Sequence, residues 1–307
     1  MKIFESLDIN EKFINPVLTI GNYDGIHIGH QKIIENVARK AREISGTAML
    51  MTFNPHPLSV LKPDTYTRLI TPLHLKKKLI EASGIEVMLL VPFDARFQSL
   101  TPEMFIKDIL VDRLAVKEII VGYDFKFGKG GAGNVTMLKK SAGTYGFRFE
   151  TIEAITLDGE RVGSNAIRKL IMDGNVEKAA RFLGRPHMIG GTVVKGENRG
   201  KWMGFPTINL DTFFELVPKN GVYVTEVELR GKRKPAVTNI GFNPTFGGKK
   251  FLMETHILDF SGNLYGKEVD IYFDKRIRDE MKFSGIDELK ERISKDVALA
   301  REHFQHT

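Results

Sequence analysis

The arrangement of apolar residues changes once along the chain, near Arg185-Pro186. Before this point, short and nearly continuous apolar runs alternate with stretches of helical periodicity, which is typical of a parallel sheet covered by helices on both faces. After it, strand patterns follow one another with turn residues between them, which favours a compact antiparallel barrel or sandwich. A chain of 307 residues is long enough for two domains. We therefore predict an α/β domain over residues 1–185 and a small antiparallel β-barrel with a C-terminal helix over residues 186–307.

The pattern also predicts the individual elements of each part. In the first part, strands are expected at 17–20, 48–53, 86–91, 118–121 and 147–152, and helices at 31–44, 72–83, 102–114, 134–145, 166–173 and 176–183. In the second part, strands are expected at 190–194, 222–229, 236–240, 252–259 and 268–273, and one helix at 286–304. Thr71-Pro72 and Thr101-Pro102 each have the pattern of a capping residue followed by proline at the first helical position.

Composition limits the partners and the compartment. Lys and Arg number 45 against 38 Asp and Glu, a net charge of +7, but the excess is spread out, with only small clusters at residues 76–78 and 230–234. Because nucleic-acid binding needs a basic stripe or patch, we expect no nucleic-acid partner and interpret these runs as solvated faces. The absence of cysteine excludes disulfides, thiolate metal sites and a cysteine nucleophile. No apolar stretch approaches the ~20 residues that span a bilayer, and the first residues are too acidic for a secretory signal, so we expect a soluble, cytoplasmic protein without a membrane partner.

The strongest local motif directly follows the first expected strand and reads Gly21-Asn22-Tyr23-Asp24-Gly25-Ile26-His27-Ile28-Gly29-His30. Three glycines let the backbone turn tightly and approach a ligand closely. Two histidines three residues apart at a helix start face one side, next to free backbone N–H groups and the positive end of the helix dipole. This arrangement suits a polyphosphate, because imidazoles can donate hydrogen bonds to oxygens that gain charge when an α-phosphate is attacked. Two partly exposed loop histidines, or a metal-binding pair, remain the alternative.

Polar groups in the second part allow two interpretations each. Thr207 and Asn209 point to the same side if their segment is extended, and their oxygens suit Mg²⁺, although a Pro-Thr-x-Asn sequence alone is more often just a turn. Glu254 stands in a largely apolar strand pattern, where a carboxylate is either a paired structural acid or a general base with a raised pKa. His256 lies on the same face, and we interpret it as a neighbour with satisfied hydrogen bonds. The chain has no Gly-x4-Gly-Lys-Ser/Thr sequence, which excludes a P-loop.

Several segments carry a resemblance to a known family. His27-Ile28-Gly29-His30, preceded by Asn22-Tyr23-Asp24-Gly25, resembles the signature of the nucleotidyltransferase superfamily, and is similar to that of the bacterial bifunctional riboflavin kinase/FMN adenylyltransferases, or FAD synthetases. Further segments agree with this family in the correct order, at 52–57, 121–128, 162–168, 204–210, 239–246 and 254–260. The resemblance covers nearly the whole chain. It implies a Rossmann-like FMN adenylyltransferase domain in residues 1–185 and a riboflavin kinase domain in residues 186–307.

The resemblance also implies a two-step reaction. In the second domain, ATP with Mg²⁺ would phosphorylate riboflavin to FMN, and Glu254 would be the base that takes the proton from the ribityl hydroxyl. In the first domain, the FMN phosphate would attack the α-phosphate of ATP to give FAD and pyrophosphate, while His27 and His30 stabilise the transition state. The partners it implies are therefore the small molecules ATP, riboflavin and FMN.

The remaining site residues also follow from the resemblance. The implied ATP and phosphate contacts are Gly21, Asn22, Asp24, Gly25, Gly29, Asn54, His56, Ser164, Arg168 and Lys201. The implied flavin contacts are Gly122, Asp124, Phe125 and Phe127, of which the two phenylalanines offer aromatic faces to an isoalloxazine ring. Thr207 and Asn209 would hold the metal ion.

One rival motif lies next to the implied flavin contacts. Gly128-Lys129-Gly130-Gly131-Ala132-Gly133 fits the dinucleotide-binding pattern Gly-x-Gly-x-x-Gly and precedes a helix. A dinucleotide fold places its first glycine directly at the end of the first strand. Here six residues intervene, and the strand is the fourth. We therefore interpret the segment as a loop beside the flavin site.

Departures from the family's pattern leave alternatives open. Gly163 and Asn165 stand where the family has hydroxyl residues, although Ser164 and Arg168 remain. Lys201 stands where arginine is usual, so that a bidentate phosphate contact would become a point charge. A riboflavin kinase with a vestigial adenylyltransferase domain is thus one alternative, and a non-catalytic flavin- or nucleic-acid-binding protein is another. The sequence does not indicate an oligomeric state.

Overall fold

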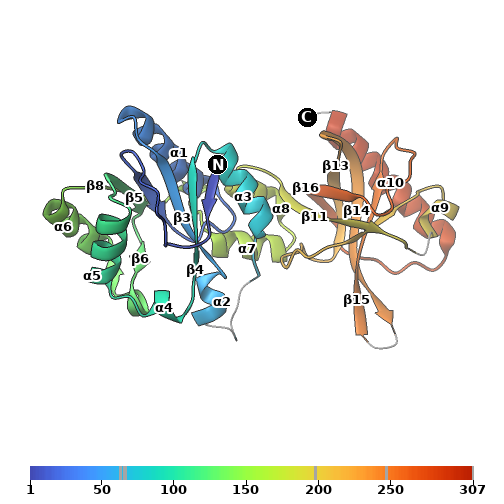
Figure 1. The fold of residues 1–307 in the computed structure, drawn as a ribbon. Coiled ribbons are helices and arrows are strands. Elements are labelled where there is room, and N and C mark those ends of the chain that lie inside the picture. Colours follow the sequence, from blue (N-terminus) through green and yellow to red (C-terminus); the bar gives the residue numbers. More distant parts are fainter. Residues whose placement is uncertain (62–63, 65–67, 197–198, 246–247, 306–307) are drawn as a thin grey trace. The chain divides into compact units, whose positions relative to one another are not determined.

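The structure, a computed structural model, describes residues 1–61, 64, 68–196, 199–245 and 248–305, without the side chains of residues 199, 201, 242–245 and 248–251. It divides into two compact units, Met1–Gly163 and Ser164–Thr307 (Figure 1). The first contains a parallel sheet with helices and the second a closed antiparallel barrel, so the predicted change of fold class along the chain is confirmed. Residues 164–185 group with the barrel in this division, and the domain boundary at residue 186 stays a prediction.

The first unit is built on a six-stranded parallel sheet with the strand order β1-β4-β3-β2-β5-β8. Its strands are β1 (Lys2–Phe4), β2 (Val17–Ile20), β3 (Ala48–Asn54), β4 (Val87–Pro92), β5 (Glu118–Gly122) and β8 (Arg148–Ile152). The sequence predicts all of them except β1. That strand has three residues, too few to show a pattern, and pairs only with β4 at the edge of the sheet.

Helices cover both faces of this sheet, which explains why its strands are continuous apolar runs. Successive strand residues point to opposite faces: Val17 packs with apolar residues of α1 (Ile28–Glu43) and α3 (Leu73–Ala82), and Leu18 with those of the π-helix Phe105–Arg113 and α6 (Val135–Tyr145). The other elements are α2 (Pro57–Leu61), α4 (Ala95–Gln98), α5 (Pro102–Met104), a 3₁₀ turn (Lys129–Gly131), β6 (Lys126–Phe127), β7 (Gly133–Asn134), β9 (Thr156–Leu157) and β10 (Glu160–Arg161).

The helix starts confirm one predicted cap and correct another. Thr101 caps α5 through its hydroxyl, which accepts the N–H of Met104, and Pro102 is the first helical residue, as predicted. Before α3, however, Pro72 itself is the capping residue and makes no side-chain hydrogen bond. The N–H of Thr71 instead donates to the Asp24 carboxylate at 3.0 Å. The buried Thr71 hydroxyl makes no hydrogen bond to the described residues, so the predicted side-chain cap is wrong.

Most of the predicted site residues of the first part lie in loops at the end of the sheet where its strands finish. The strand order reverses at β2, since β3 and β4 lie on one side of it and β5 and β8 on the other. Open parallel sheets bind ligands outside the carboxyl ends of their strands at such a reversal. Gly21 follows the end of β2, Asn54 ends β3 and Gly122 ends β5. The three loops that carry the predicted residues thus start from this edge.

The second unit contains a closed six-stranded barrel, β11-β12-β15-β14-β13-β16, with antiparallel neighbours throughout. Its strands are β11 (His187–Val194), β12 (Ile208–Asp211), β13 (Gly221–Leu229), β14 (Lys232–Thr245), β15 (Gly248–Ile257) and β16 (Glu268–Arg278). The predicted barrel is confirmed, and the predicted strands are confirmed apart from their lengths. The sequence does not predict β12 as a strand, because its four residues follow directly on the Phe205-Pro206-Thr207 turn.

The barrel strands have an inner and an outer face. Thr238 on β14 turns inward, where its hydroxyl lies 2.8 Å from that of Thr225 and 2.9 Å from that of Thr255. Its neighbour Val237 turns outward and packs against α10 (Ile286–Gln305), the predicted C-terminal helix. By strand alternation, Asn239 lies on the same outer face as Val237.

Helices precede and follow the barrel in this unit. α7 (Ser164–Met172) and α8 (Val176–Leu183) pack together, and α8 also contacts β11 and β16. The short helix α9 (Arg199–Trp202) lies between β11 and β12. In the part of the chain that the structure describes, we find no helix with both the length and the apolar character needed to cross a membrane.

Candidate active sites

The first candidate site is formed by the loop between β2 and α1. His27 is the capping residue of α1, and its Nδ1 accepts the backbone N–H of His30 at 3.3 Å. The two imidazole rings stack, with centroids 3.7 Å apart and planes inclined by 18°. A Cβ atom on Gly29 would lie 3.1 Å from the His27 ring, so glycine leaves room for this arrangement. The two histidines therefore lie together at the helix N-terminus, as the motif predicts.

His30 has a buried nitrogen without a partner. Its Nδ1 is shielded from solvent and makes no hydrogen bond to any described residue. Burial lowers the pKa of His30 well below its usual value of 6.5, and the nearby charges of His27 and Lys76 lower it further. His30 is thus neutral at physiological pH. Because the Nδ1 of His27 already accepts an N–H, a shared metal ion is the less favoured interpretation of this pair.

Asn22 and Asp24 hold this loop in place. The carboxylate of Asp24 is buried and accepts the backbone N–H groups of Ile70 at 3.2 Å and Thr71 at 3.0 Å. The carbonyl of Asn22 accepts Lys76 Nζ at 2.8 Å and the Thr52 hydroxyl at 3.2 Å. Gly21 and Gly25 lie in the same turn. The bonds of Asp24 give it a structural role, and its direct contact with a nucleotide stays a prediction.

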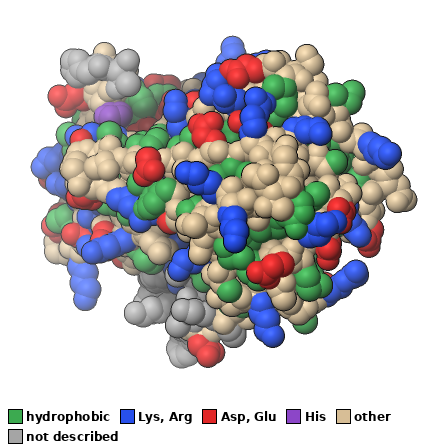
Figure 2. Space-filling model, turned by 90° about the vertical axis from the view of Figure 1, so that its left-hand side faces the viewer, with side chains coloured by type: hydrophobic (Ala, Val, Ile, Leu, Met, Phe, Trp, Pro, Cys, Tyr) green, Lys and Arg blue, Asp and Glu red, His purple; other side chains and the backbone are tan. Residues whose placement is uncertain are grey.

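Lys76 corrects the interpretation of the 76–78 run as a solvated face. Lys78 is exposed and Lys77 is partly exposed beside Glu5, but Lys76 is only 5% exposed. A helical face explains the difference, because α3 turns Lys76 and Ile80 toward the sheet side by side. Figure 2 shows one face of the molecule, on which Lys and Arg side chains are interspersed with Asp and Glu.

Two further predicted residues follow β3. Asn54 is exposed at the end of that strand, and its carbonyl accepts the N–H of Phe93 at 3.3 Å. His56 is buried, and its Nδ1 accepts the N–H of Leu58 at 3.2 Å at the start of α2. Both therefore lie at the expected edge of the sheet, and their contacts with a nucleotide stay predictions.

The predicted flavin residues follow β5. Phe125 and Phe127 stack with centroids 5.6 Å apart, but Phe127 is buried against Phe105 while Phe125 is partly exposed. Phe125 is thus the ring with more accessible surface. Asp124 is exposed and pairs with Arg161 at 2.5 Å, a residue that the sequence analysis does not single out. Gly122 lies beside Asp124, and a Cβ there would lie 3.4 Å from its carboxylate.

The rival glycine motif has a local explanation in the structure. Gly128 and Gly133 flank a 3₁₀ turn that joins β6 and β7 into a small hairpin. Pro102 lies against Gly128, and the ring of Phe127 lies against Gly133, both closer than a Cβ would allow. The glycines permit this close packing, which supports the interpretation as a loop rather than a dinucleotide fingerprint.

Ser164 and Arg168 belong to α7, in the second compact unit. Arg168 is buried, and its guanidinium donates to Asn165 Oδ1 at 2.7 Å. Asn165, which stands where the family has a hydroxyl residue, therefore orients Arg168 through its side-chain oxygen. Contacts of Ser164 and Arg168 with phosphate stay predictions.

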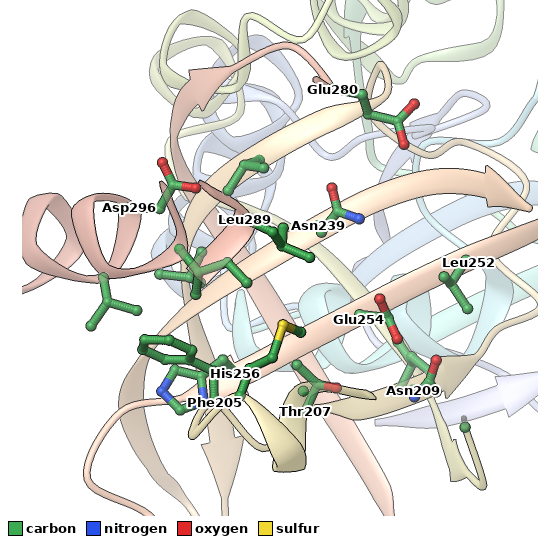
Figure 3. A pocket seen from close by; sticks show the side chains of 18 of the residues that line it. Phe205, Thr207, Asn209, Asn239, Leu252, Glu254, His256, Glu280, Leu289 and Asp296 are labelled. Atoms are coloured by element: carbon green, nitrogen blue, oxygen red, sulfur yellow. The ribbon is translucent and has the colours of Figure 1, made fainter. Parts of the chain in front are cut away.

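The second candidate site is a cavity of about 1070 Å³ on the outer face of the barrel (Figure 3). Strands β12, β14 and β15, residues 194–196 and 203–207 and helix α10 contribute to its wall. Thr207, Asn209 and Glu254 all line it, as do Asn239 and Arg278. The cavity therefore brings together the three residues predicted for the second part.

Glu254 occupies the centre of a row of polar residues across three strands. It is register-paired with Asn209 on β12 and with Asn239 on β14. Opposite residues of an antiparallel pair present side chains on the same face, about 4.5–5.5 Å apart at Cβ. Figure 3 shows Glu254 beside Asn209, with Asn239 on the neighbouring strand. Asn239 belongs to the 239–246 segment that resembles the family but is not among the predicted site residues, because only the strand register brings it next to Glu254.

Asn209 has a buried oxygen without a partner. The residue is 7% exposed, and its Oδ1 makes no hydrogen bond to any described residue. The backbone of Gly196 lies so close to its amide that a Cβ would be 2.0 Å from Nδ2. The hydroxyl of Thr207 lies near Gly200 in the same wall. An unpartnered amide oxygen beside a hydroxyl fits a hard cation such as Mg²⁺. The side chain of Lys201 lies outside the described part.

Neighbouring side chains are fixed by their own partners. The ring of His256 lies 2.8 Å from the carbonyl of Pro206 through Nδ1 and contacts the ring of Phe205, in agreement with its interpretation as a satisfied neighbour. Arg278 makes a bidentate ion pair with the buried Asp296 of α10, in which Nη2 donates to Oδ2 at 2.7 Å and Nε to Oδ1 at 3.2 Å. This pair fixes α10 over the cavity, and the sequence contains no local signal for it.

Comparison with known proteins assigns both sites to one family. A family model of FAD synthetase matches residues 9–166, and one of riboflavin kinase matches residues 183–304. A bifunctional riboflavin kinase/FMN adenylyltransferase of Escherichia coli K12 is 38% identical over 94% of this chain and 92% of its own length. One of Bacillus subtilis 168 is 39% identical over 97% and 95%. The chain belongs to this bifunctional family.

A solved structure extends the likeness to the fold of the whole chain. It comes from a Streptococcus pneumoniae protein described as a macrolide-efflux protein, with a TM-score of 0.89 and 30% identity over 97% of this chain and 98% of that one. Both family models that match the present chain describe flavin-synthesising enzymes, a FAD synthetase and a riboflavin kinase. The first model ends at residue 166 and the second begins at residue 183, so most of α7 and α8 lies between them.

Proposed function

We propose that this chain performs the two steps of FAD synthesis at two separate sites. The chain is a bifunctional transferase that phosphorylates riboflavin to FMN and then adenylylates FMN to FAD with ATP. A kinase with a vestigial first domain is not favoured, because both family models match and the similar relatives are bifunctional. The observation that carries the assignment of sites is a buried polar atom without a partner in each of them, His30 Nδ1 and Asn209 Oδ1.

Glu254 is the proposed base of the kinase step. A ribityl hydroxyl is a poor nucleophile at neutral pH, so its attack on the γ-phosphate needs an acceptor for the proton. Glu254 lines the cavity and stands opposite Asn209 on one neighbouring strand and Asn239 on the other. The carboxylate takes the proton as the hydroxyl oxygen bonds to phosphorus and ADP leaves. Asn239 is the proposed positioning residue for Glu254.

Thr207 and Asn209 are the proposed holders of Mg²⁺ with the ATP phosphates. A bound Mg²⁺ would neutralise charge on the transferred phosphoryl group. The support is the chemistry of the donors, a hydroxyl and an unpartnered buried amide oxygen in one wall of the cavity. Gly196 supports the arrangement, since it leaves the space that the Asn209 amide occupies.

His27 and His30 are the proposed transition-state stabilisers of the adenylyl step. The FMN phosphate is already ionised, so its oxygen attacks the α-phosphate without a base, and pyrophosphate leaves. The need is for donors to oxygens that gain charge, and these act best when they are fixed beforehand. Ring stacking and the Nδ1 contact to the His30 N–H fix the His27 ring, which in its neutral form carries its proton on Nε2.

The other predicted contacts are part of this proposal. We propose that ATP contacts Gly21, Asn22, Asp24, Gly25, Gly29, Asn54, His56, Ser164, Arg168 and Lys201, and that flavin contacts Gly122, Asp124, Phe125 and Phe127. We also propose a cytoplasmic location, small-molecule partners only, and a domain boundary at residue 186. Two observations support these assignments. The residues match the family's motifs, and most of them lie in loops at the carboxyl ends of the parallel strands.

The product pattern of the purified full chain tests the function. Riboflavin and ATP with Mg²⁺ are added, and flavins are separated by chromatography over time. FMN that appears first and is converted to FAD supports the two-step function. FMN alone would support a kinase with a vestigial first domain, and no product would support a binding protein. Adding FMN in place of riboflavin isolates the second step.

A further inference from the structure

Of the three consecutive lysines at positions 76–78, Lys76 is the one that is buried. Its exposed fraction is 5%, although a buried ammonium is costly unless it is paired and hydrogen-bonded. Burial lowers the pKa of Lys76, and the carboxylate of Asp24 opposes this change. None of the predicted contacts with substrate involves this residue. A charge kept in the interior next to a catalytic loop needs an explanation beyond packing.

The contacts of Lys76 link α3 to the loop that precedes the histidines. Its Nζ donates to the carbonyl of Asn22 at 2.8 Å, so α3 reaches into the loop. In the opposite direction, the loop residue Asp24 accepts the N–H groups of Ile70 and Thr71, which lie just before α3. The loop and α3 are therefore joined by a reciprocal pair of contacts: the Lys76 ammonium of α3 binds the loop backbone, and the Asp24 carboxylate of the loop binds the backbone before α3.

This reciprocal pair lies next to His30. Three titratable groups of the described elements face His30: His27 at the start of the same helix, Tyr23 in the loop and Lys76 on α3. The ring centroids of Tyr23 and His30 are 5.0 Å apart. Tyr23 is held by a 2.5 Å hydrogen bond with Thr19. Lys76 is thus the group that brings a fixed positive charge from another element.

We propose that Lys76 is a positioning residue of the adenylyl-transfer site, which holds the 21–25 loop in place through the Asn22 carbonyl. This inference rests on the proposed function of the first unit and adds a residue to it. Lys76 contacts the loop backbone rather than substrate. It therefore acts on the rate of transfer by fixing the two imidazoles in place.

The test compares Lys76→Met with Lys77→Met and Lys78→Met in the full chain. Lys77 and Lys78 are matched controls on the same helix turn, and both reach solvent. Because misplacement of about 1 Å can cost roughly 100-fold in rate, we expect Lys76→Met to lower kcat for FAD formation from FMN by about 10- to 100-fold. The KM for FMN should change little. The controls and the kinase rate of each sample should stay at wild-type values.

The pH profile separates positioning from a merely structural role. Removing the Lys76 charge raises the pKa of His30, since that charge lowers it in the wild type. The acid-side limb of the kcat profile for FAD formation should therefore move to higher pH in Lys76→Met. Thr52→Val removes the other donor to Asn22 and keeps the charge, so it should lower kcat without moving this limb.

Several outcomes would overturn the inference. Wild-type kcat in Lys76→Met, or equal losses in the Lys77 and Lys78 variants, would remove Lys76 from the mechanism. If Lys76→Met does not fold, Lys76→Gln keeps a donor without charge, and a Lys76→Gln enzyme with an unchanged kcat and acid limb would equally overturn it. A wild-type chain that forms no FAD from FMN overturns the proposed function itself. FAD formation at the same rate in wild type and variant overturns only this inference.

Discussion

The two units handle the same kind of substrate with different side chains. The first presents two stacked imidazoles at a helix N-terminus, at the carboxyl edge of a parallel sheet. The second presents a carboxylate between two amides on the outer wall of an antiparallel barrel. Both sites would meet ATP. The barrel site is thus centred on a carboxylate, whereas the sheet site is centred on two imidazoles.

The difference follows from the nucleophile of each step. A ribityl hydroxyl must lose a proton as it attacks, so the barrel site needs a base. The phosphate of FMN is ionised before it binds, so the sheet site needs donors that stabilise charge. The nucleophile's protonation state, rather than the shared ATP, therefore determines which side chains each fold provides. Substitutions that affect one step and spare the other test this view.

The largest effect is expected for Glu254→Gln. The amide keeps the shape of the side chain but cannot accept the proton, and general bases contribute about 10²–10⁴-fold. We expect FMN formation from riboflavin to fall at least about 100-fold, with FAD formation from added FMN nearly unchanged. Both rates and the melting temperature are measured on one preparation.

Glu268→Gln is the matched control for this substitution. Glu268 is exposed at the start of β16 and does not line the described cavity. If Glu254 only paired structurally, Glu254→Gln would lower the melting temperature and leave turnover intact in the folded fraction. A folded Glu254→Gln protein with wild-type kinase turnover would remove the carboxylate from the mechanism and weaken the comparison between the units.

The second-largest loss of rate is expected for His30→Ala. Loss of one fixed donor to developing charge typically costs about 10²–10³-fold in kcat. We expect FAD formation from FMN to fall by this amount, while riboflavin phosphorylation stays near its wild-type rate. The two steps are assayed separately with riboflavin and with FMN. Equal losses in both steps would contradict the assignment of one step to each unit.

The sequence predicts the elements of this fold well where the signal is local. Apolar runs such as 17–20 and 48–53 identify buried strands, and the Thr101-Pro102 cap is confirmed. The Thr71-Pro72 cap is wrong, because the helix begins one residue later than predicted and Pro72, which has no side-chain acceptor, is its capping residue. The N–H of Thr71 instead donates to Asp24, 47 residues away. Charge runs are similarly ambiguous, since burial of Lys76 depends on which side of α3 faces the sheet.

Site prediction follows the same rule. His27 and His30 are neighbours in sequence, and the structure confirms that they lie together. Asn209, Asn239 and Glu254 come from three strands and meet only through the barrel register. Asn239 begins the 239–246 segment that resembles the family, but the sequence alone does not place it beside Glu254. The Arg278–Asp296 pair is likewise a contact of tertiary structure alone.

The third prediction concerns the domain boundary. α8 contacts β11 and β16, and its Val176, Phe182 and Leu183 are fully or almost fully buried. Burial of such a side chain contributes about 1.5–3 kcal/mol. We therefore expect a fragment of residues 164–307 to unfold at higher temperature than one of residues 187–307, with kinase activity in the folded fraction of both. Equal melting temperatures in calorimetry would favour the boundary at 186 and count against α8 as part of the barrel unit.

The smallest effect is a pH dependence confined to the barrel unit. Asp274 is the extra residue at an irregularity between β13 and β16, and its Oδ2 is buried without a hydrogen-bond partner among the described residues. Burial, together with the nearby charge of Glu226 and against that of Arg233, raises its pKa to about 7. The folded state therefore binds more protons than the unfolded state between about pH 4 and 7, and stability falls as pH rises through this range.

Asp274→Asn removes this cost, because an amide does not ionise. The substitution should raise the melting temperature of the barrel unit by roughly 2–4 °C at pH 8 and leave it unchanged at pH 5, where the wild-type carboxyl is already protonated. FAD formation from FMN should not respond at either pH, since the first unit does not contain this residue. Calorimetry at the two pH values measures the shift. A gain of the same size at pH 5 would show that the effect comes from packing, and no gain at pH 8 would show that the carboxyl is ionised without cost in the folded barrel.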